Sequence, residues 1–322
     1  MRVKLLIYVL LALFAVSGCA TFKEIKGKDY RDSAKLNFDE GVKYLKAEEY
    51  EIAEKYFSLV QSKFTFSMYS KTSELLVADT FYLRDMFAEA IDYYKKLQRS
   101  HPEHACVPYT QFMAGESHFE QVSEDWWFMP PVYEKDQKTT EKAMVEYQRL
   151  LYMLDAEGYK FEKDYEPPKL RVCTGMDTEQ ERAYAFVSRK KIRYCLRRLV
   201  DREVYVAHFY MDRDKPLGAI GRLEDVRKRY PAVNDDLEVL MLSAEAYEAA
   251  RQFDKAIEAW KMLKEIHSKK PEVKDIDLQK KLAQLEKDKL SWQESEKKRI
   301  AEERERMTEL KAKDKRGEFD VE

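Results

Sequence analysis

The chain has 322 residues, with 58 basic and 60 acidic side chains and a formal net charge of −2 at pH 7. This balance argues against a nucleic-acid-binding protein, which would carry a basic excess. Charged residues make up 37% of the chain and there are only nine glycines and nine prolines, a composition typical of a soluble, nearly all-helical protein.

Residues 1–18 have the pattern of a bacterial lipoprotein signal peptide. Arg2 and Lys4 precede an uncharged apolar core, Leu5 to Val16. Spanning a hydrocarbon core of ~30 Å takes about 20 residues, so these twelve are too few for a transmembrane helix. The core ends at Val16-Ser17-Gly18-Cys19, which resembles a lipobox. We therefore expect a lipid on the Cys19 thiol; the alternative is an ordinary secretory signal with a chance cysteine.

After a polar tether at residues 19–33, one pattern recurs through residues 34–270. Corresponding positions lie 37 residues apart, as from Ala207 to Ala244 and from Ala219 to Ala256. A ring follows the first small residue by three positions, and a bulky residue follows the second by four. This is the signature of the tetratricopeptide repeat (TPR), in which small residues let two helices approach and bulky ones fill the gap. Because no helix pair buries its apolar face alone, we expect an all-α, TPR-like solenoid of about five pairs. The expected repeats are residues 34–67, 71–104, 108–157, 189–233 and 237–270.

The third repeat is interrupted. Gly115 and Ala143 stand 28 residues apart where the pattern requires twelve, so 16 residues are inserted. The insertion carries Trp126 and Trp127 beside two prolines. These rings either plug the end of the helix pair or form an exposed partner-binding patch. A second inserted loop is expected at residues 155–188.

Beyond Cys19 the chain has three cysteines, Cys106, Cys173 and Cys195. An exported protein meets an oxidising compartment, so at most one disulfide and at least one free thiol are expected. The pairing stays open. Cys195 lies in a helical pattern and is expected to be buried.

Residues 271–322 differ in composition from the repeats. A short apolar stripe is formed by Leu278, Leu282 and Leu285. It indicates a helix that caps the last repeat. The dense charges that follow predict either a solvated helix or a disordered tail. Heptad positions for a coiled coil are not sustained. We expect residues 316–322 to be disordered.

No motif in the sequence points to an enzyme or a metal centre. The spacing His101-x-x-His104 brackets a proline turn and has no evident third ligand, so a structural role is favoured. There is no Gly-rich phosphate loop and no G-x-S-x-G motif. We therefore expect no catalytic residue, no metal and no cofactor other than the lipid on Cys19.

Taken together, the lipobox, the repeats and the interruption resemble the BamD family, TPR lipoproteins of the bacterial β-barrel assembly (BAM) machinery. The resemblance covers Cys19 and roughly residues 37–267. Its more specific parts are Met68-Tyr69-Ser70, His101-Pro102, Lys135-Asp136-Gln137 and the stretch from Leu196 to Pro231.

The resemblance implies a scaffold on the periplasmic face of the outer membrane. The C-terminal repeats would bind the periplasmic domains of a BamA-like barrel protein, and the N-terminal ones would help to capture unfolded outer-membrane proteins. Companion BAM lipoproteins are further candidate partners. Ala20, rather than Asp, after the lipidated cysteine favours sorting to the outer membrane. Loop 155–188 and the tail depart from the family pattern.

Two sets of residues are candidate binding sites. In a TPR stack the first helix of each pair lines the inner groove, and here that lining is rich in rings, which suits an extended segment with alternating apolar side chains. The alternative is that these rings are packed between repeats. The groove set is Phe38, Tyr82, Phe112 and Phe119.

Arg222 matches the family position implicated in the contact with BamA. Its guanidinium suits a bidentate pair with a partner carboxylate. The alternative is an intrachain pair with Glu224, Asp225 or the neighbouring repeat. Two further functions stay open for the chain: a pilotin-type TPR lipoprotein for secretin or type IV pilus assembly, and a cell-envelope coordination factor.

Overall fold

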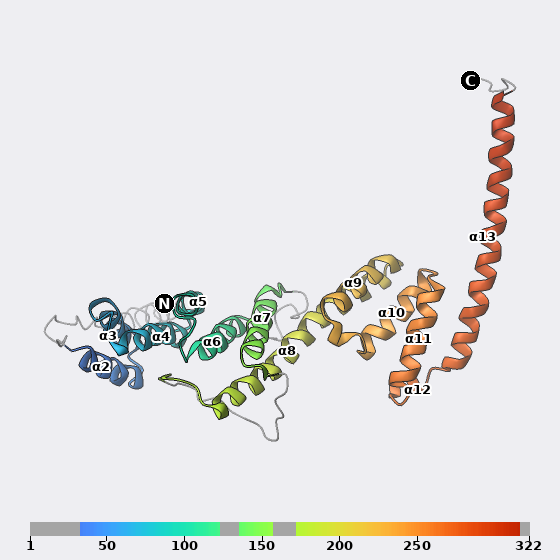
Figure 1. Ribbon diagram of the computed structural model, residues 1–322. Coiled ribbons are helices and arrows are strands. Elements are labelled where there is room, and N and C mark those ends of the chain that lie inside the picture. Colours follow the sequence, from blue (N-terminus) through green and yellow to red (C-terminus); the bar gives the residue numbers. More distant parts are fainter. Residues whose placement is uncertain (1–32, 123–134, 157–171, 316–322) are drawn as a thin grey trace, which may run out of the picture. The chain divides into compact units, whose positions relative to one another are not determined.

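A computed structural model describes residues 33–122, 135–156 and 172–315, and the helices follow one another along the chain as labelled in Figure 1. No strand occurs in these ranges. The signal peptide, Cys19, Trp126, Trp127 and the last seven residues lie outside them. The chain divides into two compact units, residues 1–110 with 170–175 and residues 111–169 with 176–322. We describe each unit by itself.

The first unit contains two helical hairpins. α2 (Ala34–Lys46) pairs with α3 (Tyr50–Lys63), and α4 (Met68–Leu83) pairs with α5 (Phe87–Ser100). A side chain at Gly41 would place its Cβ 2.6 Å from the Phe57 ring, so the hairpin closes only with glycine there. Ala53 and Ala90, at the matching place of each second helix, are fully buried. The small-residue positions of the repeat therefore set the distance between helices.

Helix α6 (Val107–Glu120) begins where the first unit ends, and the second unit continues with a long series of helices. Gly115 packs against the Tyr147 ring and Gly218 against the Tyr210 ring, as Gly41 packs against Phe57. The remaining elements are α7 (Lys138–Met153), α8 (Thr178–Met211), α9 (Pro216–Arg229), η3 (Pro231–Val233), α10 (Leu237–Ala249), α11 (Phe253–His267), α12 (Pro271–Lys274) and α13 (Leu278–Lys315).

The prediction of a loop at residues 155–188 is wrong from Thr178 onward. Helix α8 starts there and runs 34 residues without a break. A capping box explains the start: the Asp177 side chain accepts from the Gln180 backbone N–H at 2.9 Å, and the Gln180 side chain accepts from the Asp177 N–H at 3.1 Å. Two orphan amides of the first turn are thereby satisfied. The fourth repeat thus begins with a helix longer than the pattern predicts.

The sequence predicted either a solvated helix or a disordered tail after the cap, and the structure shows a helix, α13. Leu278 and Leu285 of α13 are buried in the cluster that also holds Trp260 and Leu263 of α11. The beginning of α13 therefore packs on the last repeat, where the cap is expected. Beyond Trp292 the described side chains of α13 are largely exposed. None of the described helices combines the length and the apolar character needed to span a membrane.

The turns inside the repeats share one backbone feature. Four of them join two helices through a non-glycine residue in the left-handed region. In the turns after α2, α4, α8 and α10 these residues are Glu48 (φ 60°), Asp85 (59°), Asp214 (54°) and Arg251 (56°). The positions 48 and 85, and again 214 and 251, differ by the same 37 residues as the repeat pattern. The repeat therefore fixes a turn geometry as well as an apolar pattern.

Candidate partner-binding site

A polar hollow of about 520 Å³ lies in the second unit, between the start of α7, the middle of α8 and the end of α9. Its wall is built from charged side chains of both signs rather than from apolar ones. Such a surface favours a partner with its own matching charges and sets the register of binding more than the affinity. The residues that matter most here are Arg202, Glu203, Arg229 and Tyr230.

In the wall of this hollow Glu203 is almost fully buried, at 7% exposure. Two arginines of α9 approach its carboxylate: Arg222 Nη1 lies 3.5 Å from one oxygen and Arg229 Nη2 lies 3.5 Å from the other. Arg229 also pairs with Asp225 at 2.7 Å, one helical turn away. A buried charge of this kind needs compensation, and the two guanidinium groups supply it. Both arginines therefore lie close to Glu203, although Oε2 of its carboxylate accepts no hydrogen bond from the residues that the structure describes.

Arg222 thus makes an intrachain pair, but with neither Glu224 nor Asp225. Its partner is Glu203, which lies on the preceding helix. The Arg222 side chain remains 48% exposed, so a carboxylate of another protein can reach its guanidinium. Partner contact and intrachain pairing are consequently compatible. Glu224 instead accepts from Lys255 at 2.7 Å and from the Tyr247 hydroxyl at 2.9 Å, and these donors lower its pKa.

A second hollow of about 470 Å³ lies on the same unit between α8, α10 and α12. Its lining includes the apolar Leu237, Met241 and Leu242 together with several carboxylates. Arg197, also in the lining, contacts three acidic groups: Asp201 at 2.6 Å, Asp236 at 3.1 Å and Glu238 at 2.7 Å. Sequence reasoning missed this surface. The acidic side chains at positions 236 and 238 could have indicated it.

The ring residues of the expected groove are mostly packed within each unit. In the first unit Phe38 is 9% exposed and lies 5.1 Å from the Tyr69 ring, measured between centroids, while Tyr82 is partly buried against Phe87. In the second unit Phe112 is 4% exposed and its centroid lies 4.6 Å from that of Tyr184.

Phe119 is partly buried beneath Lys191, whose ammonium lies 4.1 Å from the ring centroid. These contacts fit the alternative of rings packed between helices. Tyr82 and Phe119 keep part of their surface open to solvent. Peptide binding by this set stays a prediction.

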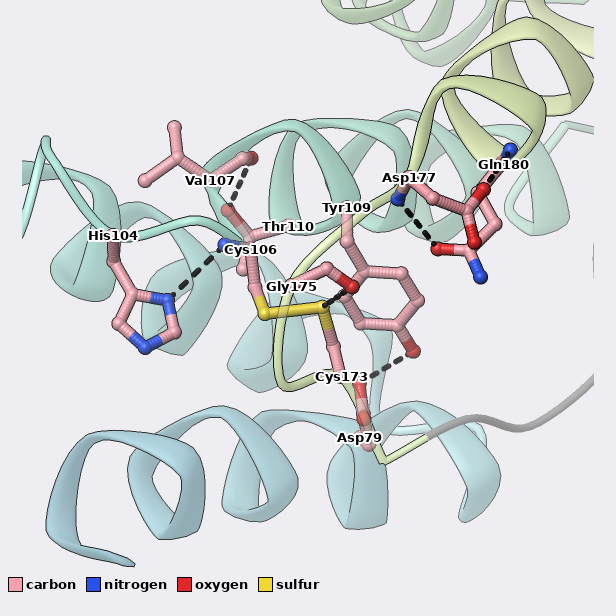
Figure 2. Close-up of a disulfide and its surroundings, with 10 residues drawn as sticks. All are labelled: Asp79, His104, Cys106, Val107, Tyr109, Thr110, Cys173, Gly175, Asp177 and Gln180. Atoms are coloured by element: carbon pink, nitrogen blue, oxygen red, sulfur yellow. Dashed lines mark hydrogen bonds between the residues drawn. A yellow bond between two sulfur atoms is a disulfide. The ribbon is translucent and has the colours of Figure 1, made fainter. Parts of the chain in front are cut away.

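The first unit holds a disulfide between Cys106 and Cys173, a pairing that the sequence left open (Figure 2). Both sulfurs are withdrawn from solvent, since the two residues are 0% and 1% exposed. The bond joins residues 67 positions apart and fastens the segment around Cys173 to the start of α6. Cys195 is free and buried, as expected, and burial raises the pKa of its thiol to about 12. It is therefore an inert thiol.

Beside the disulfide lies a buried carboxylate, Asp79 of α4 (Figure 2). The hydroxyls of Tyr94 and Tyr109 donate to one of its oxygens at 2.6 and 3.1 Å. The other oxygen has no hydrogen-bond partner among the described residues. Removal from water raises the pKa of Asp79 to about 7, although the two tyrosine hydrogen bonds oppose the shift.

The two histidines of the proline turn have structural contacts. His104 Nδ1 accepts the backbone N–H of Cys106 at 3.2 Å, and His101 lies 3.7 Å from a Glu74 oxygen. Within the described residues, no group of three or more His, Cys, Asp or Glu side chains is arranged to hold a metal ion.

Paired helices in a 37-residue repeat, exposed charged surfaces and a packed interior define a helical-repeat protein of the TPR type. Several solved TPR proteins are similar to this chain. The TPR2AB domain in the pHSP90 complex of yeast Sti1 is 14% identical, with 73% of this chain and 77% of that chain covered and a TM-score of 0.33. A thermophilic TPR protein of Thermus thermophilus is 14% identical, with coverage of 79% and 98% and a TM-score of 0.29.

Residues 31–156 and 181–263 match the family model named YfiO, described as outer membrane lipoprotein. Over 213 residues the chain is also 22% identical to the outer membrane protein assembly factor BamD of Vibrio cholerae, covering 65% of this chain and 76% of the relative. The chain therefore belongs to the BamD (YfiO) family of outer membrane lipoproteins. The stretch between the two matched segments contains Cys173 and the start of α8.

Proposed function

We propose that this protein is a non-enzymatic scaffold of outer-membrane β-barrel assembly, anchored through a lipid on Cys19 to the periplasmic face of the outer membrane. Family membership supports the assembly role, and the lipobox supports the anchor. The lipid is the only covalent group that the proposal requires. Unfolded barrel proteins are the proposed cargo, with Tyr82 and Phe119 as the ring residues that keep exposed surface.

The proposed partner is a BamA-like barrel protein, bound through its periplasmic domains by the second unit. One observation carries this part: Arg222 pairs with the buried Glu203 and is still 48% exposed. An arginine that already pairs within its own chain loses less freedom when it meets a partner carboxylate than an unpaired one does. The guanidinium can form a bidentate, charge-assisted pair, which is stronger than a neutral hydrogen bond. Trp126, Trp127 and companion lipoproteins remain further candidates for the same assembly.

The experiment is crosslinked affinity capture from native membranes with a tag after Glu322. The proposal predicts recovery of a large barrel protein that has periplasmic domains, and a reduced yield from the Arg222→Ala variant. Recovery of a secretin ring in its place would assign the chain to the pilotin class and refute the assembly role. Incorporation of labelled palmitate, and its loss in Cys19→Ala, tests the anchor separately.

A further inference from the structure

Large apolar side chains protrude from one place in the first unit. Phe66, in the turn between α3 and α4, is fully exposed, and Met68, which begins α4, is 82% exposed. Leu36, in the first turn of α2, is 43% exposed. Single exposed apolar residues are ordinary, but a group of them on one surface marks a binding region. We call Leu36, Phe66 and Met68 the apolar tip.

Packing inside the unit places all three at the same end of the first hairpin. Gly41 packs against Phe57 and Tyr44 stacks on Tyr56, so α2 and α3 run antiparallel and the end of α3 lies beside the start of α2. The Phe38 and Tyr69 centroids are 5.1 Å apart, which brings the first turn of α4 to the same end. The N-terminal tether joins α2 here, because Ser33 is its N-cap.

The length of that tether decides what the apolar tip can meet. From Cys19 to Ser33 the chain advances by about 14 residues, which reach at most about 50 Å when fully extended. If Cys19 carries the lipid of the proposed function, on which this inference rests, the tip lies at the end of the first unit where the anchor is attached. Lys35 and Lys63 are exposed beside the tip, and Lys71 nearby pairs with Glu103 at 3.5 Å. Long lysine side chains reach lipid phosphates while apolar neighbours enter the membrane interface.

We propose that the apolar tip is a second membrane contact, which inserts Leu36, Phe66 and Met68 into the headgroup region of a phospholipid leaflet and orients the first unit on it. A lipid surface fits the shape better than a protein partner. Protruding side chains on a turn need no complementary pocket in a fluid interface, and interfacial binding strength follows the apolar area inserted. The tether alone would leave the orientation of the unit free.

Photocrosslinking in the complete, lipidated chain tests the contact. The photoreactive residue p-benzoylphenylalanine replaces Phe66 in one variant and Tyr152 in another; Tyr152 lies on α7 and is 89% exposed, so it is the matched control. After irradiation of native membranes, the proposal predicts phospholipid adducts at position 66 and none at position 152. Adducts of position 66 with a protein, or no adduct at all, would overturn the proposal.

A vesicle-binding measurement tests the apolar tip in the absence of the lipid anchor. The mature chain carrying Cys19→Ser, and therefore no lipid, is mixed with vesicles of anionic phospholipid. We expect Phe66→Ser with Met68→Ser to weaken binding about tenfold, with Tyr152→Ser unchanged. Both residues are exposed, so the fold should be unaffected, and thermal unfolding checks this. If all variants bind the vesicles equally, the apolar tip is not a membrane contact. If Cys19 is not acylated in cells but the vesicle binding is as expected, only the lipid anchor of the proposed function is refuted.

Discussion

In the first unit the carboxylate of Asp79 is enclosed between two tyrosine hydroxyls beside a buried disulfide, whereas in the second unit Glu203 pairs with two arginines that are 48% and 40% exposed. Both units bury an acidic group. The first compensates it with neutral donors and seals it from solvent. The second compensates it with cations that reach the surface. A polar group is therefore enclosed by packing in one unit and leaves charge exposed at the surface in the other.

This difference has a physical consequence for how each unit responds to change. A carboxylate held by neutral donors in a dry site keeps its proton up to a higher pH than one in water, so the stability of the first unit depends on pH and on the disulfide. Ion pairs between exposed side chains contribute typically about 0–1 kcal/mol to stability. When one of the two arginines is removed, the other still compensates the buried Glu203. Alterations in the charged surface of the second unit should therefore change binding more than folding.

The largest expected effect is loss of the disulfide. Replacing Cys106 and Cys173 with alanine should lower the unfolding free energy of the first unit by about 4 kcal/mol, the value for a closed loop of this length. Denaturant titration with and without a reductant measures it. The reductant should destabilise the parent chain and leave the double variant unchanged. Equal stability of parent and double variant in the absence of reductant would contradict the account.

The second effect concerns pH. The folded-state pKa of Asp79 is raised to about 7 from 3.8, so the folded chain binds a proton that the unfolded chain has lost. Stability from this group is complete below pH 3.8 and is lost as pH rises toward and through 7. Between about pH 5 and 8 the loss amounts to about 2–3 kcal/mol. Asp79→Asn should remove this pH dependence of the stability. The variant should exceed the parent in stability by the largest margin at about pH 8. Thermal unfolding across this range measures it, and parallel curves for the two proteins would refute the assignment.

The third effect tests close packing within a repeat. A Cβ added at Gly115 would lie 2.8 Å from the Tyr147 ring, so Gly115→Ala should destabilise by about 1–3 kcal/mol through overpacking. Gly221 is the matched control, because no atom lies within 4 Å of the corresponding Cβ. Gly221→Ala on α9 should stabilise by about 0.5–1 kcal/mol, since alanine favours helix. Chemical denaturation measures the unfolding free energy of both variants. A change of the same sign in both would show that the close contact between Gly115 and Tyr147 does not determine stability.

The smallest effect is at the turns. Arg251 has φ 56°, a conformation that costs a residue with a side chain some free energy, so Arg251→Gly should stabilise by about 0.5–1 kcal/mol. Lys261→Gly, at an exposed position in the interior of α11, should destabilise by about 1 kcal/mol. Thermal unfolding distinguishes the two. A loss of stability in Arg251→Gly would show that its side chain makes a contact that outweighs the strain.

Periodicity predicted much of this fold, whereas contacts between distant residues did not follow from it. The spacing from Ala207 to Ala244 placed the helix pairs, because each small residue marks a helix contact. The extension of α8 to Thr178 was missed, although Asp177 and Gln180 form a capping box that the sequence displays.

The site residues were harder to predict than the helices. The pairing of Cys106 with Cys173 depends on a loop closure that three cysteines alone leave ambiguous. Glu203 lies on another helix from Arg222, so their contact requires the packing of the pair. The proton affinity of Asp79 likewise depends on its burial, which the residue type alone does not indicate.

The central claim is that the charged surface around Arg222 serves binding rather than folding. The direct measurement is the affinity of the purified chain for the periplasmic domains of the captured barrel protein. We expect Arg222→Ala to weaken it at least about tenfold, as truncation of a charge pair at an interface does. Arg229 still compensates Glu203 in this variant, so we expect only a small fall in the unfolding temperature. Lys228→Ala, on the same helix, should bind like the parent. Unchanged affinity in Arg222→Ala, or a loss that follows stability alone, would contradict the account.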